Sequence, residues 1–275
     1  MATLHERTLK GWTEFDRIAR GHGYRQWIYR GQPDAGWDLR SSLFRSFEGA
    51  LRITEAANGK PKRLARRSHE QVALRKFMSV AHQFDVPLPK DKNPIEWLAV
   101  MQHYGAPTRL LDATFSPYAA AFFALRSGTG DAAIYCTQAR IFEEYDAGFF
   151  VDFKAIYRQI LDEDHDDIMY VYEPKYTTPR LLAQQGLFLV PGSLRVSHEE
   201  IIETYGLQSK EAFKLIIPSE LRKDGIAHLR RMNNTSTMLF PGIGGFCESF
   251  AHQPLFVVQK EGRIGELEQE DADGA

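Results

Sequence analysis

The stretch QHYGAPTRLLDATFSPYAAAFFA, residues 102–124, decides the fold because it joins the end of one helix to the start of another. The first helix begins at Asn93 and is expected to run to about Tyr104, where Gly105 ends it. Ser116, which proline follows, repeats the start signal ahead of an apolar helix. The residues between the two helices form a tight crossing segment.

This stretch is dense in polar side chains, although its surroundings are apolar. It contains His103, Tyr104, Thr108, Arg109, Asp112, Thr114 and Ser116. Buried polar groups without partners are costly, so we expect these side chains to face each other or a ligand. The backbone N–H groups that follow Ser116 at the helix start offer a place for an anion.

Structural roles compete with this functional interpretation. Ser116 is a sufficient N-cap without any further task, and His103 is equally consistent with a hydrogen-bonded core histidine. In the same structural interpretation, Arg109 bonds locally to Asp112. Arg30, from an earlier segment, then forms a buried structural ion pair with Asp112.

Composition sets broad limits on the fold and on the partners. The chain has 275 residues, a formal net charge of −2 and a hydrophobic fraction of 43%. These values predict one large folded domain, or one domain with a small annex, and no overall attraction to nucleic acid or membrane. Neither a membrane-length apolar run nor an apolar signal core is present, and Cys136 and Cys247 lie among apolar residues. We therefore expect a cytoplasmic protein with reduced cysteines and no membrane partner.

The pattern of apolar residues predicts an α+β fold with a helical early half and a mixed or mainly antiparallel sheet. Residues 62–84 are expected to form a helix, and the basic side chains of its first part are interpreted as a solvated face. Strands are expected at residues 26–31, 132–137, 169–172, 186–190 and 213–218. The predicted organisation is a helical lead-in (1–25), a single domain (26–260) and a disordered acidic tail (261–275).

Four separated motifs make the chain resemble the FRG-domain family. Tyr29-Arg30-Gly31 is similar to the [FY]-R-G motif of that family, and residues 102–124 match its long central motif. Residues 180–188 resemble its later R-x-x-x-Q-x-G-x-F element, and residues 239–245 resemble its terminal L-F-P segment. The resemblance implies a functional pocket rather than a purely structural role.

A second, shorter resemblance is to ADP-ribosyltransferases, and it rests on residues 29–31 and on Thr114–Ser116 with the helix that follows. It implies that Arg30 grips a carboxylate or pyrophosphate and that Gly31 lets the backbone approach a nicotinamide. Together with the polar residues of the FRG motifs, this resemblance gives as candidate binding residues Tyr29, Arg30, Gly31, Tyr104, Thr114, Ser116 and Arg180. The catalytic residues are Arg30, His103, Arg109, Asp112 and Gln184.

The chain departs from ADP-ribosyltransferases in the late glutamate that stabilises their oxocarbenium-like transition state. Gln184 occupies the corresponding motif but carries no charge, and Glu173 and Glu248 are the nearest alternatives in sequence. The sequence therefore supports ligand binding more strongly than it supports catalysis. We expect Arg180 and Gln184 to approach the same cleft as Arg30, since an offset of four residues keeps them on one side of either a helix or a strand.

These resemblances imply a protein that recognises a nucleotide such as NAD and transfers ADP-ribose or consumes NAD, in keeping with a toxin or antiphage effector. NAD is expected as a substrate, with no tightly bound cofactor, and a protein or nucleic acid as acceptor. The alternative is a non-catalytic module that binds a nucleotide or nucleic acid. A nuclease would need a metal site, and the acidic run at residues 162–167 reads as a solvated turn instead.

Overall fold

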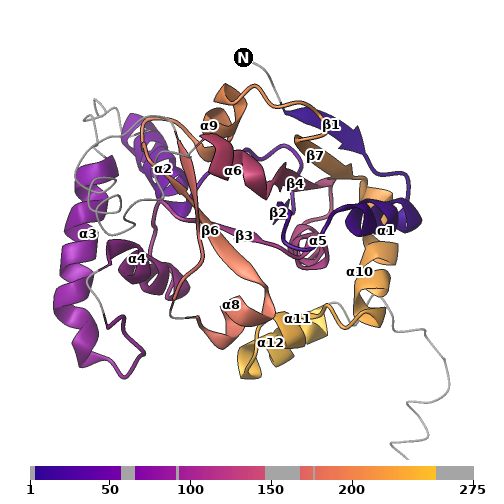
Figure 1. Cartoon of the computed structure of the whole chain (residues 1–275). Helices are drawn as coiled ribbons and strands as arrows, with labels where there is room; N and C mark the ends of the chain where they lie inside the picture. The colour runs from indigo at the N-terminus through magenta and orange to yellow at the C-terminus, as the bar shows by residue number, and fades with distance from the viewer. Residues whose placement is uncertain (1–3, 57–65, 91–92, 146–167, 176, 252–275) are drawn as a thin grey trace, which may run out of the picture.

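The computed structural model describes residues 4–56, 66–90, 93–145, 168–175 and 177–251. Within these ranges a mixed seven-stranded sheet has the order β1-β7-β4-β2-β3-β6-β5 (Figure 1). The strands are β1 (His5–Thr8), β2 (Trp27–Gln32), β3 (Leu111–Thr114), β4 (Ala132–Gln138), β5 (Met169–Tyr172), β6 (Gly186–Pro191) and β7 (Ala212–Ile217). The pair β1–β7 is parallel and the other pairs are antiparallel.

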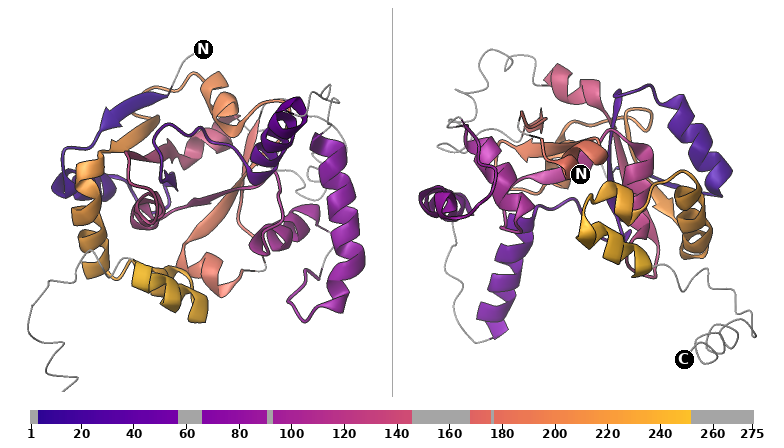
Figure 2. Two further views of the ribbon diagram at one scale, coloured as in Figure 1. Left: turned by 180° about the vertical axis from the view of Figure 1, so that it is seen from behind. Right: turned by 90° about the horizontal axis from the view of Figure 1, so that it is seen from below.

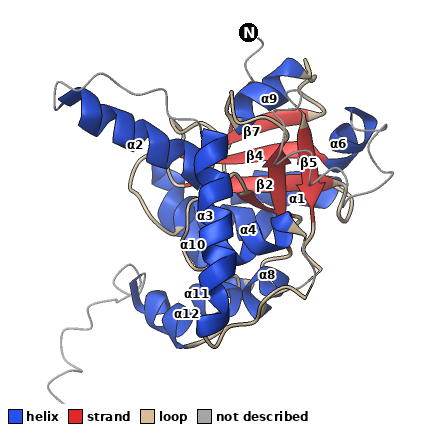
Figure 3. Cartoon of the chain, turned by 90° about the vertical axis from the view of Figure 1, so that its left-hand side faces the viewer, coloured by secondary structure: helices blue, strands red, loops and turns tan. Residues whose placement is uncertain are grey.

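Helices cover both faces of this sheet (Figures 2 and 3). They are α1 (Trp12–Gly21), α2 (Ser42–Ala56), α3 (Arg66–Val80), α4 (Pro94–His103), α5 (Pro117–Leu125), α6 (Ala139–Tyr145), α8 (Pro179–Ala183), α9 (His198–Thr204), α10 (Arg222–Arg231), α11 (Ser236–Leu239) and α12 (Ile243–Glu248). Short 3₁₀ turns occupy η1 (Ala81–Gln83) and η2 (Ser219–Leu221). None of the helices in the described ranges combines the length and apolar character needed to cross a bilayer.

The predicted α+β class is confirmed, and so are the five expected strands, with ends that differ by one residue or less. Strands β1 and β3 were not predicted. The first lies in a polar, fully exposed tetrapeptide, and the second lies in the segment interpreted as a crossing. The expected tail and the first residues of the basic helix lie outside the described residues.

Capping residues place the two helices that flank β3. The side chain of Asn93 accepts a hydrogen bond from the Ile95 amide at 3.0 Å and so begins α4. The side chain of Ser116 accepts one from the Ala119 amide at 3.1 Å and begins α5. Both starts agree with the sequence prediction.

Alternate residues of β2 enter different cores, as period-two alternation requires. Trp27 and Tyr29 pack into the cluster that includes α1, α5 and α10, whereas Ile28 packs into the cluster with α6 and α9. A third cluster joins α3 and α4 to β5 and β6, where Phe188 is buried.

On one face of the sheet, the helices leave β3 uncovered. Leu111 and Ala113 belong to the cluster under α6 and α9, so Asp112, the residue between them, faces the opposite side of the sheet. On that side α5 lies over β2 and β4, while α4 packs against β5 and β6. Asp112 lies between these two helical layers and is paired in register with Phe188 of β6.

Candidate functional site

A cleft of about 320 Å³ lies over the part of β3 that no helix covers. Helix α4 forms one wall, α8 and Pro241 form the other, and β3 and β6 form the floor. Its lining residues include Gln102, His103, Tyr104, Asp112, Pro174, Arg180, Leu181, Gln184, Phe188 and Pro241. The volume lies at the lower end of the range typical of small-molecule sites.

Asp112 is the exposed carboxylate of this cleft. Its side chain is 60% exposed. Gln102 Nε2 donates to Asp112 Oδ1 at 3.0 Å, and the hydroxyl of Thr108 donates to Gln102 Oε1 in turn. The hydrogen-bond chain fixes the Gln102 amide and therefore one oxygen of Asp112, while the other oxygen faces Arg30.

Arg30 reaches Asp112 across a gap between two strands. β2 and β3 pair only at Tyr29–Thr114, so the strands separate beyond that position. Arg30 spans the gap: its Nη1 donates to the backbone carbonyl of Asp112 at 2.8 Å and lies 3.6 Å from Oδ2. The Nε atom of Arg30 is buried without a hydrogen-bond partner among the described residues.

A second hollow, of about 120 Å³, adjoins the cleft. It is lined by Arg30, Ser42, Arg45, Gln102, Gly105, Ala106, Leu110, Leu111 and Asp112. Gln102 and Asp112 line both cavities, so these two side chains form the partition between them. The guanidinium groups of Arg30 and Arg45 give the smaller hollow a positive charge that the single carboxylate of Asp112 does not offset.

The charges around the two cavities shift the pKa values of their basic groups. Burial lowers the pKa of Arg30, the Asp112 carboxylate opposes this, and the nearby charge of Arg45 adds to it. Burial, and then the charge of Arg180, lower the pKa of His103, which favours the neutral imidazole. An anion between Arg30 and Arg45 would relieve the repulsion between them.

Arg180 and Gln184 both line the cleft from α8 and the turn after it. Arg180 lies over the ring of Phe240, 4.5 Å from its centroid, and burial lowers its pKa while Asp112 opposes this effect. Gln184 is buried and donates from Nε2 to the Leu239 carbonyl at 2.8 Å. Arg180 and Gln184 therefore share one cleft, but Arg30 lines the adjoining hollow, so the expectation that both residues approach the same cleft as Arg30 is met only in part. The Gln184 amide holds α11 in place.

Arg109 lies outside the cleft, and the expected local bond between Arg109 and Asp112 is wrong. Arg109 is 1% exposed and pairs through Nε with Glu70 Oε2 of α3 at 2.6 Å. Glu70, also fully buried, accepts a second bond from the Arg109 amide at 2.8 Å. This buried carboxylate lies in α3, the helix whose basic side chains are interpreted as a solvated face, and that interpretation does not extend to Glu70.

Four further predicted binding residues contact other parts of the protein and do not face an open cavity. Tyr29 is buried, and its hydroxyl lies 2.7 Å from Nδ1 of His22. The space next to Gly31, expected to admit a nicotinamide, is filled: a Cβ there would lie 1.9 Å from the Ala120 carbonyl oxygen of α5. Thr114 donates from its hydroxyl to the Gln184 carbonyl at 2.6 Å. Ser116 serves as the N-cap of α5.

Neither candidate for the late glutamate lines the cleft. Glu173 pairs with Arg25 on the surface, and Glu248 pairs with Arg126 at 2.5 Å. Glu96, an acidic residue that does line it, is 1% exposed and accepts hydrogen bonds from the Tyr172 hydroxyl and the Lys175 amide. Asp112 is therefore the carboxylate that is open to a ligand among the described lining residues.

The three motif segments nevertheless lie on neighbouring strands. Arg30 is on β2, Thr114 ends β3, and Gln184 lies two residues before β6, in the sheet order β2-β3-β6. Sequence reasoning missed Gln102 and Arg45 as cavity residues. Gln102 opens the quoted central stretch, so its place there was a usable signal, whereas nothing local in the sequence distinguishes Arg45.

No cluster of three or more His, Cys, Asp or Glu side chains in the described part of the chain is arranged to hold a metal ion. In a comparison with family models, residues 25–132 match the FRG domain. The later motifs at residues 180–188 and 239–245 lie beyond this match. No curated protein and no solved structure matches the chain.

Proposed function

The chain carries an FRG domain at residues 25–132, and from this premise we propose that it recognises a nucleotide, with NAD as its substrate, around Asp112. The observation that carries the proposal is the pair of cavities that share Asp112 and Gln102, one positively charged and one with aromatic and apolar walls. A nucleotide has matching parts: anionic phosphates and a flat, largely apolar base.

In this proposal the phosphates occupy the smaller hollow. Arg30 offers a planar fork of donors, and Arg45 is exposed, so both suit a phosphate or pyrophosphate. The ring system lies in the larger cleft, where Tyr104 is 54% exposed and Phe188 and Pro241 add apolar surface. Arg180, which is stacked on Phe240, supplies a further positive charge at the far wall.

The proposed chemistry uses Asp112 as an electrostatic stabiliser. When the bond between ribose C1′ and the nicotinamide nitrogen breaks, its electron pair leaves with nicotinamide and positive charge develops on the ribose. A carboxylate held by Gln102 and Arg30 stabilises that charge. Water or an acceptor then bonds to C1′ and loses a proton, which gives NAD hydrolysis or ADP-ribose transfer. Loss of NAD would suit a toxin or antiphage effector.

One observation favours the second candidate, a nucleotide- or nucleic-acid-binding module without catalysis. Gln184, in the later FRG motif, takes a plausible place for the glutamate of ADP-ribosyltransferases, and its amide donates to the Leu239 carbonyl. A module of this kind needs the arginines and the ring pocket but not the carboxylate. The two candidates therefore differ in the role of Asp112.

We expect Arg30→Lys to weaken NAD binding about ten- to hundredfold, because lysine keeps the charge but loses the planar fork. The melting temperature without NAD should fall by no more than about 2–4 °C, since the contact with Asp112 is partly exposed to solvent. Thermal melts with and without NAD measure both effects. Arg25→Lys, which changes a surface pair with Glu173, is the matched control. A large loss of stability in Arg30→Lys without NAD would indicate a structural arginine.

We expect Asp112→Asn to reduce NAD consumption about a hundredfold while NAD binding changes little, because asparagine keeps the shape but cannot stabilise developing positive charge. Release of nicotinamide, followed by chromatography, measures the rate. Glu173→Gln, a surface carboxylate outside the cleft, should retain full activity. If the wild-type protein binds NAD but releases no nicotinamide, the non-catalytic module replaces the enzyme.

A further inference from the structure

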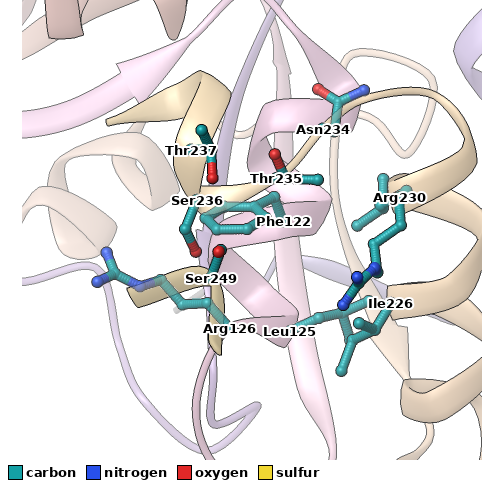
Figure 4. Close-up of a pocket in the computed structure, with 11 residues that line it drawn as sticks. Phe122, Leu125, Arg126, Ile226, Arg230, Asn234, Thr235, Ser236, Thr237 and Ser249 are labelled. Carbon is teal, nitrogen blue, oxygen red and sulfur yellow. The ribbon is translucent and has the colours of Figure 1, made fainter. Parts of the chain in front are cut away.

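A separate pocket, shown in Figure 4, shares no lining residue with the cleft at Asp112. It has a volume of about 140 Å³ and lies between α5, α10, α11 and α12. Its apolar residues are Phe122, Leu125, Ile226 and Leu229, and its polar residues are Arg126, Arg230, Asn234, Thr235, Ser236, Thr237 and Ser249. We propose that this pocket binds a compact oxyanion on a short apolar group, such as an alkyl phosphomonoester.

The first argument is an unpartnered hydroxyl. Ser236 is 2% exposed, and its Oγ has no hydrogen-bond partner among the described residues. Such a group costs free energy in the empty protein unless a ligand or water supplies a partner. In Figure 4 the Ser236 side chain lies at the pocket beside Phe122. The structure therefore offers an unused donor in the pocket wall.

The residues on either side of Ser236 also carry hydroxyl groups that line the pocket. Thr235 occupies the N-cap position of α11, but its side chain makes no capping hydrogen bond. Thr237 follows Ser236, so three consecutive hydroxyl residues line one wall. Ser249, on the α12 side, donates to the Phe246 carbonyl at 2.6 Å and keeps its oxygen as an acceptor. The hydroxyl donors of residues 235–237 suit the several oxygens of a phosphate or carboxylate, whereas Ser249 adds no donor.

Charge and shape select the ligand class. No acidic side chain is among the described residues that line this pocket, whereas Arg126 and Arg230 both are. Arg126 is paired with Glu248 and lies over the ring of Phe240, so its charge is partly offset. The apolar lining residues, Phe122, Leu125, Ile226 and Leu229, favour a ligand that also carries a hydrocarbon group. The volume equals that of about five water molecules, so this group is short.

The test titrates the full chain with monoethyl phosphate, followed by amide chemical shifts of residues 235–237. We expect saturable shifts with a dissociation constant in the millimolar range, and none with the neutral alcohol 1-propanol. Ser236→Ala should weaken binding about fivefold, and Arg230→Gln about tenfold. Thr237→Val, which keeps the side-chain shape, serves as a second hydroxyl variant. Ser79→Ala, in the exposed part of α3, is the matched control and should bind as the wild type does.

Three results would overturn the proposal: no saturable shifts, unchanged affinity in all three pocket variants, or equal binding of 1-propanol. Folding does not obscure the test, because Ser236→Ala removes a hydroxyl that has no partner within the described part of the chain and should keep the wild-type melting temperature. The Arg30→Lys variant should bind monoethyl phosphate normally at this pocket. Unchanged chemical-shift titration of residues 235–237 in Arg30→Lys would therefore show that this pocket is distinct from the proposed nucleotide site.

Discussion

Glu70→Ala is expected to lower the free energy of unfolding by about 3–5 kcal/mol, because it leaves the charge of Arg109 buried without its carboxylate. Both side chains are essentially inaccessible, with exposures of 1% and 0%, so water cannot replace the missing partner. Glu70 also accepts a hydrogen bond from the Arg109 amide, so the substitution removes a backbone contact two residues before β3. Urea unfolding measures the loss.

The matched control for Glu70 is Glu173→Ala. Glu173 is also paired with an arginine, Arg25, but its side chain is 51% exposed, so its loss should cost at most about 1 kcal/mol. Replacing both Glu70 and Arg109 with apolar residues of similar volume should recover much of the stability. If Glu70→Ala unfolds at the same urea concentration as Glu173→Ala, the buried pair does not hold α3 against the sheet.

Gly31→Ala is expected to lower the free energy of unfolding by about 3 kcal/mol or more, which is at or above the upper end of the usual cost of overpacking. The added Cβ would lie 1.9 Å from the Ala120 carbonyl oxygen and 2.8 Å from the Ala124 amide nitrogen. These are backbone atoms of α5, so no side-chain rotation relieves the overlap. Helix α5 must instead move away from β2.

Circular dichroism melts of Gly31→Ala and Gly130→Ala test this explanation. A Cβ on Gly130 would meet nothing within 4 Å, so that variant should melt within a few degrees of the wild type. A wild-type melt for Gly31→Ala would contradict the packing role. It would also reopen the expectation that Gly31 makes room for a ligand.

The local patterns of the sequence predict most elements that position the cleft. Asn93 and Ser116 mark the starts of α4 and α5 because capping depends on residues within one turn. Alternation in residues 26–31 predicts which β2 side chains enter which core. The four-residue offset between Arg180 and Gln184 correctly predicts that they share a cavity.

The errors concern contacts between segments that are distant along the chain. Arg109 pairs with Glu70, 39 residues earlier, and no local pattern distinguishes that partner from the nearby Asp112. The space beside Gly31 is filled by α5, about ninety residues later in the chain, which the FRG and ADP-ribosyltransferase motifs do not reveal. Strand β1 is polar and exposed, so its pairing with β7 depends on backbone hydrogen bonds without a hydrophobic pattern.

A crystal structure of the protein soaked with NAD tests the central proposal most directly, because the proposal places the nucleotide around Asp112. We predict electron density in the cleft between α4 and α8, with phosphate oxygens within hydrogen-bond distance of Arg30 or Arg45 and a ring against Tyr104. Absence of density in both cavities at a saturating NAD concentration, or NAD bound only elsewhere, would contradict it.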